Sequence, residues 1–114
     1  MSTNNIMKFG KYKAIINYDP DIEMFRGEFI GLNGGADFYA DNIHDLKKEG
    51  DTSLKVFLDM CKEEGITPQK SYSGRFNVRI PPAIHEKVVV SATAENKSLN
   101  QWITDTLTSH ISTV

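Results

Sequence analysis

The sequence predicts an α+β protein built from two small parts. Residues 11–40 carry β-prone, partly alternating side chains between turn-forming residues, which is typical of antiparallel strands. Residues 43–64 carry apolar side chains three and four positions apart, which indicates a helix. After a break at residues 67–70, the pattern becomes strand, helix, helix. A chain of 114 residues that is divided in this way has domains too small to bury much surface alone, so a partner is expected.

The first part is predicted to contain a three-stranded meander. Residues 11–18 are the first strand, and Asp19-Pro20-Asp21 forms the turn that closes it. Residues 22–30 return as the second strand, and Asn33-Gly34-Gly35 supplies a turn suited to positive φ. A short third strand is expected at about residues 36–40.

A helix capped by Asp41 or Asn42 is expected to cover this sheet. Gly50 stands where its apolar stripe requires a larger side chain, and glycine there costs about 1 kcal/mol relative to alanine. A kink at Gly50 is therefore an alternative to one helix that reaches Glu64 and stops at Gly65. The apolar positions of the stripe are Ile43, Leu46, Leu54, Phe57, Leu58 and Cys61.

The segment Thr67-Pro68-Gln69-Lys70 is the predicted boundary between domains at residues 1–66 and 71–114. Residues 1–65 carry eight lysines and arginines against twelve carboxylates, a net charge of −4, whereas residues 66–114 carry five against three, a net charge of +2. The two parts are therefore expected to meet different partners.

Residues 74–80 alternate strictly between two kinds of side chain, as a half-buried strand does. One face carries Phe76, Val78 and Ile80, and the other carries Arg75, Asn77 and Arg79. Pro81-Pro82 ends the strand, and a proline is tolerated in the first turn of a helix. The first helix is expected at about residues 82–95, with Asn96 as a left-handed stop.

The second helix of this part is expected to open with Ser98-Leu99-Asn100-Gln101, which has the form of a capping box. Its apolar face includes Trp102 and Ile103. One strand and two helices cannot close a core, because both strand edges stay unpaired. Antiparallel pairing of this strand in two chains would solve the problem. The dimer core would then contain Phe76, Val78, Ile80, Trp102 and Ile103.

Such a two-stranded ribbon fits the major groove of double-stranded DNA. Arg75 and Arg79 suit the O6 and N7 acceptors of guanine, and Asn77 suits adenine. Lys97, Ser98 and Asn100, at the start of the second helix, are the predicted contacts to phosphate, because helix N-termini attract anions.

The segments Arg-Phe-Asn-Val-Arg-Ile-Pro and Lys-Ser-Leu-Asn-Gln-Trp-Ile resemble the ribbon-helix-helix superfamily of repressors. Taken with Tyr18-Asp19, Phe25-Arg26-Gly27-Glu28 and Phe57-Leu58-x-x-Cys61-Lys62, the chain is similar to HicB-family antitoxins over about residues 10–111. The resemblance implies a partial RNase H-like first domain that neutralises a HicA-type, mRNA-cleaving toxin. It also implies a second domain that represses its own operon as a homodimer or a higher oligomer. Asn33-Gly34-Gly35 and Gly50 depart from the family pattern.

Enzymatic activity is not expected. An RNase H-like nuclease holds metal with clustered carboxylates, the first of which lies inside strand one, and residues 11–18 contain none. The single cysteine and three histidines lack metal-ligand spacing, so no metal or cofactor is expected. With one cysteine, no apolar run of ~18 residues and no visible signal peptide, the protein is expected in the cytoplasm, away from membranes. A stand-alone repressor without a toxin remains the alternative to an antitoxin.

Overall fold

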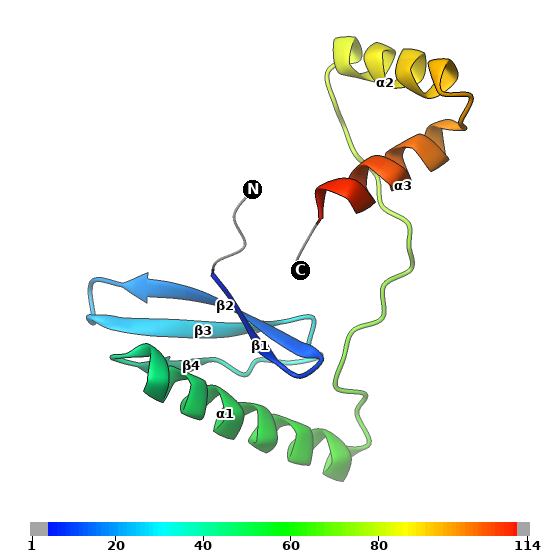
Figure 1. Ribbon diagram of the computed structural model, residues 1–114. Coiled ribbons are helices and arrows are strands. Elements are labelled where there is room, and N and C mark those ends of the chain that lie inside the picture. The colour runs from blue at the N-terminus through cyan, green and yellow to red at the C-terminus, as the bar shows by residue number, and fades with distance from the viewer. Residues whose placement is uncertain (1–4, 112–114) are drawn as a thin grey trace. The chain divides into compact units, whose positions relative to one another are not determined.

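The computed structural model describes residues 5–111 and shows an α+β protein with one antiparallel sheet and three helices (Figure 1). Its internal contacts divide the chain into two compact units between Tyr72 and Ser73. The first unit holds the sheet and one long helix, and the second holds two helices. No helix within residues 5–111 is both long and apolar enough to cross a membrane.

The sheet has four strands in the order β1-β2-β3-β4, so the expectation of a three-stranded meander is wrong by one strand. The strands are β1 Ile6–Phe9, β2 Tyr12–Asp19, β3 Met24–Ile30 and β4 Phe38–Ala40. The missed strand is β1, which pairs with β2 from Ile6↔Ile15 to Phe9↔Tyr12. Its four residues are too few for periodicity to reveal, and its stability comes from pairing. Gly10, at φ 64°, provides the left-handed turn between the two strands.

The single helix of the first unit, α1 (Ile43–Glu64), is continuous, so the alternative of a break at Gly50 is excluded. At its start, the Asn42 side chain accepts a hydrogen bond from the Asp45 N–H at 2.8 Å. At its end, Gly65 adopts φ 68° and its N–H is bonded to the Cys61 carbonyl. Both helix ends are thus as the sequence predicts.

Gly50 belongs in α1 because the helix packs directly against a phenylalanine. A Cβ atom on Gly50 would lie 2.4 Å from the Phe9 ring. That ring is itself held edge-on by Phe29 and Phe38, at centroid distances of 5.0 and 5.7 Å. The absent side chain therefore lets α1 approach the sheet. The buried apolar residues of this core are Phe9, Ala14, Phe29, Leu32, Ala36, Phe38, Ala40, Leu46, Leu54, Phe57 and Cys61.

We expect Gly50→Ala to lower the thermal stability of the protein. Alanine improves helix propensity by about 1 kcal/mol. However, its methyl group would have to displace the Phe9 ring, which is packed between Phe29 and Phe38, at a cost of about 1–3 kcal/mol. The control is Asp51→Ala, at an exposed neighbouring position of the same helix, where only the propensity gain applies. A melting temperature of Gly50→Ala equal to or above that of wild type would show that the close approach is not needed.

Residues 67–70, predicted to separate the domains, are bonded into the first unit. The Asn33 N–H donates to the Pro68 carbonyl at 2.9 Å, and the Lys70 N–H donates to the Gly31 carbonyl at 2.8 Å. The Asn33 side chain also donates to the Thr67 carbonyl at 2.7 Å. The Asn33-Gly34-Gly35 turn thus anchors the chain that leaves α1, and the division between units lies further along.

The second unit contains α2 (Pro82–Ala94) and α3 (Leu99–His110), as the sequence predicts within one residue. Asn96, at φ 56°, is the expected left-handed residue between them. Ser98 caps α3, because its hydroxyl accepts a hydrogen bond from the Gln101 N–H at 3.0 Å. Local sequence signals therefore determine this helical hairpin.

Candidate functional site

The second unit has almost no core of its own. Of its described residues, only Ala92 is a buried hydrophobic residue, at 3% exposed. Phe76 and Val78 are 75% and 67% exposed. The other exposed large hydrophobic residues of this unit are Ile80, Ile84, Val89, Val90, Leu99, Ile103, Leu107 and Ile111. The free energy gained by burying so little apolar surface does not offset the entropy lost when two helices are ordered. The second unit therefore needs another apolar surface to pack against.

The strand expected at residues 74–80 does not form in the single chain, where this segment is an open trace (Figure 1). A strand requires a neighbouring backbone, and the described structure pairs this segment with none. All six alternating side chains are exposed: Arg75, Phe76, Asn77, Val78, Arg79 and Ile80. Residues 76–80 and His85 line an open hollow of about 720 Å³. The predicted polar and apolar faces are both present and both uncovered.

The two helical residues predicted for a dimer core differ in their surroundings. Trp102 is half-buried, and its indole Nε1–H donates to the Glu95 carboxylate at 2.6 Å. Ile103, the next residue, remains 39% exposed. The indole therefore joins α3 to the end of α2, while Ile103 stays open to another surface.

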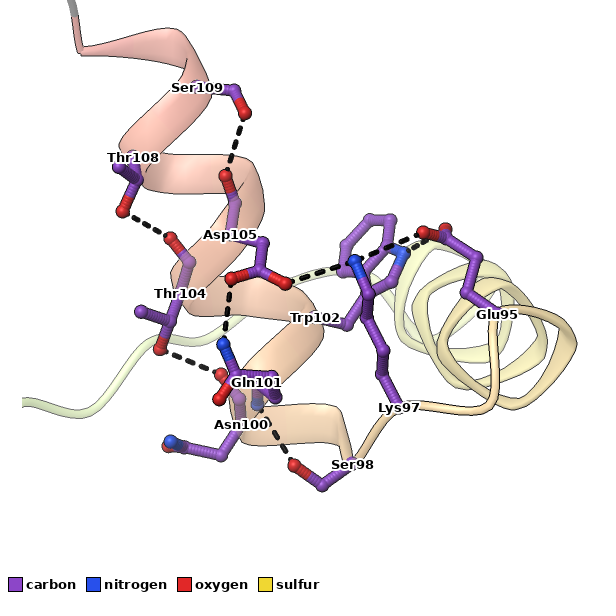
Figure 2. A network of polar contacts seen from close by, with 10 residues as sticks. All are labelled: Glu95, Lys97, Ser98, Asn100, Gln101, Trp102, Thr104, Asp105, Thr108 and Ser109. Atoms are coloured by element: carbon purple, nitrogen blue, oxygen red, sulfur yellow. Dashed lines mark hydrogen bonds and ion pairs between the residues drawn. The ribbon is translucent and has the colours of Figure 1, made fainter.

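Lys97 is held within an ionic network at the turn between α2 and α3 (Figure 2). Its ammonium lies 2.9 Å from the Asp105 carboxylate and 3.4 Å from that of Glu95. Asp105 also accepts from the Gln101 side chain at 2.7 Å. Hydrogen bonding to Asp105 raises the pKa of Lys97, and bonding from Lys97 and then Gln101 lowers the pKa of Asp105. The charge expected to meet a phosphate is thus compensated by two carboxylates.

The N-terminus of α3 shows half of the predicted capping box. The Ser98 hydroxyl bonds to Gln101, but the Gln101 side chain reaches forward to Asp105 instead of back to Ser98. The first intrahelical bond joins the Trp102 N–H to the Ser98 carbonyl at 2.9 Å. The N–H groups of Leu99 and Asn100 precede it and have no partner within the helix. These two groups, together with the exposed Asn100 side chain, are what the turn presents to an anion.

Sequence reasoning missed the roles of Glu95 and Asp105 in this turn and assigned the Gln101 side chain to the capping box instead of to Asp105. The four-residue spacing of Gln101 and Asp105 is a usual helical pair and could have been found. The contacts of Glu95 with Trp102 and of Lys97 with Asp105 cross between elements. Only the folded turn brings those side chains together.

Carboxylates of the first unit take part in local structure. Asp19 accepts a hydrogen bond from the Asp21 N–H at 3.0 Å within the β2–β3 turn. Asp37 forms an ion pair with Arg26, which also lies 2.9 Å from Glu28. Within residues 5–111, no group of three or more His, Cys, Asp or Glu side chains is placed to hold a metal ion.

The fold and this site define a two-unit α+β protein whose C-terminal helical unit lacks a core of its own. The model of the HicB family matches residues 57–107, from the second half of α1 through most of α3. This match covers 51 of the 114 residues and is a similarity to the HicB family over that stretch. Searches of curated proteins and of solved structures found no significant match.

Proposed function

We propose that the protein is an antitoxin that binds and neutralises a HicA-type, mRNA-cleaving toxin and represses its own operon. It acts by binding and not by catalysis. In this proposal residues 1–72 bind the toxin through a partial RNase H-like domain. The second unit forms a ribbon-helix-helix homodimer on operator DNA.

The uncovered second unit carries the DNA-binding half of the proposal. Antiparallel pairing of residues 74–80 from two chains would satisfy their backbone groups and bury Phe76, Val78 and Ile80. Since side chains alternate along a strand, Arg75, Asn77 and Arg79 of both chains would then share the opposite face. Side chains of these types suit base edges in the major groove.

Phosphate contacts are assigned to the N-terminus of α3. The free N–H groups of Leu99 and Asn100 fit an anion at a helix start, and Ser98 and Asn100 flank them. Lys97 contributes less than its charge suggests, because Asp105 and Glu95 compensate it. Its role is to hold the turn that presents the helix.

The toxin-binding half of the proposal is supported by the HicB-family match and by charge. Residues 1–65 have a net charge of −4, which suits a basic RNA-binding partner. Complementary charge speeds association and makes it sensitive to salt, while buried apolar contacts supply most of the affinity. A stand-alone repressor would share the DNA-binding unit but would have no such partner.

Growth rescue tests the antitoxin assignment. The proposal predicts that the adjacent reading frame encodes a small basic protein. That protein should arrest growth when expressed alone, and co-expression of the full-length chain should restore growth. The Arg75→Ala/Asn77→Ala/Arg79→Ala variant should restore growth equally, because neutralisation is assigned to the first unit. Arrest that persists despite a soluble, folded chain would favour the stand-alone repressor.

A further inference from the structure

Figure 1 shows that β2 turns into β3 at the same end of the first unit where α1 begins, and four large apolar residues belong to these segments. Tyr18 is 53% exposed, and Ile22 and Ile43 are 50% exposed. Phe25 is half-buried and meets the Tyr18 ring edge-on, at a centroid distance of 5.3 Å. We call these four residues the apolar end patch. Single exposed hydrophobic residues are ordinary, but a group at one end of a domain marks an interaction surface.

Strand register places five carboxylates around this patch. Phe25 pairs with Tyr18 on one side and with Ala40 on the other, so the residues after Ala40 lie beside the β2–β3 turn. The carboxylates are Asp19, Asp21, Glu23, Asp41 and Asp45. Residues 17–25 and 38–46, which form this end, contain no lysine or arginine, and Arg26, the next residue, is ion-paired with Asp37 and Glu28. Lys8, Lys11 and Lys13 lie at or beside the β1–β2 turn, at the opposite end of β2.

Three of the five carboxylates have local roles, and two do not. Asp19 accepts from the Asp21 N–H at 3.0 Å. Asp41 and Asp45 accept from the Asn42 side chain at 2.6 and 2.9 Å, at the start of α1 where negative charge is favourable. The side chains of Asp21 and Glu23 are exposed, and Glu23 holds the turn at φ 52°. Asp21 and Glu23 are therefore the charges that can be changed without disturbing the turn or the helix cap.

We propose that the apolar end patch and its acidic rim are the docking surface for a basic protein, with Tyr18 and Ile22 as anchors. The rim repels nucleic acid and anionic membranes and favours a partner whose lysines and arginines surround an apolar contact. The proposal rests on the toxin-binding function proposed above and gives that function its location. Rim charges steer the encounter, and the anchors determine how long the complex lasts.

The test measures binding of the full-length chain to the basic protein of the adjacent reading frame by surface plasmon resonance at two salt concentrations. Asp21→Lys/Glu23→Lys should slow association about tenfold at low salt and flatten the salt dependence. Lysine keeps an unbranched side chain at Glu23, so the backbone strain is unchanged. The control is Glu49→Lys/Glu63→Lys, which makes the same change in charge at exposed positions of α1 and should bind like wild type.

A second pair of variants tests the anchors. Tyr18→Ala should speed dissociation about tenfold or more, whereas Tyr72→Ala, at an exposed tyrosine outside the patch, should not. If Asp21→Lys/Glu23→Lys and Tyr18→Ala both bind the basic protein with the kinetics of the wild-type chain, the apolar end patch is not the docking surface. The antitoxin assignment would still stand in that case. No binding by wild type would overturn both. Loss of self-association in the charge-reversed variant, with partner binding unchanged, would assign the surface to a second copy of the chain and defeat the proposal.

Discussion

Combined replacement of Arg75, Asn77 and Arg79 by alanine should abolish preference for the operator while the protein stays folded. Each good contact to a base edge contributes about 1–3 kcal/mol of discrimination, so loss of all three should reduce the ratio of operator to random-DNA affinity at least about a hundredfold. Stability should change little, because these side chains are exposed and support no helix. The measurement is footprinting on the sequence upstream of the gene, with a parallel titration of random DNA.

The matched control for this prediction is Lys70→Ala/Lys87→Ala. It removes the same positive charge at exposed positions outside the proposed ribbon, so it should weaken binding to both DNAs alike and preserve their ratio. Undiminished operator protection by the triple variant would show that this segment does not read the bases.

Val78→Asp should convert the proposed dimer into a monomer. Val78 is 67% exposed in the single chain, so the substitution harms no contact within that chain. In the proposed ribbon it would bury two carboxylates between paired strands, and burying unpaired charge is strongly unfavourable. Sedimentation should show the mass falling from twice 12.8 kDa to 12.8 kDa, with loss of operator binding.

Asn77→Asp is the control for this dimer test. It introduces the same charge one residue away, on the opposite face of the proposed strand, where water remains available. It should stay dimeric while its DNA binding weakens. A Val78→Asp protein that keeps its dimeric mass would place the subunit contact elsewhere.

The helix boundaries could be predicted because their causes lie within a few residues. Asn42 bonds to Asp45, Gly65 to Cys61 and Ser98 to Gln101, so each signal is complete in a short stretch of sequence. The same holds for the left-handed Asn96. The order of β2, β3, β4 and α1, and of α2 and α3, followed from such signals and from apolar periodicity.

Contacts between distant segments could not be predicted in this way. The four-residue β1 is stabilised by its partner β2, and residues 67–70 are bonded to a turn more than thirty positions earlier. Lys97 carried the expected charge, but only the folded turn revealed Asp105 and Glu95 beside it. Gly50 looked like a defect in the stripe because Phe9, which occupies its place, is far away in sequence.

The sequence by itself determined the helices, their caps, and the alternation of residues 75–80 that the proposed DNA contact requires. Local hydrogen bonds and side-chain periodicity carry that information. Tertiary structure decided which surfaces are covered: the first unit closes a core between sheet and helix, and the second leaves its apolar side chains exposed. The two units differ because they bury different amounts of apolar area within one chain. Patterns of neighbouring residues do not predict that buried area.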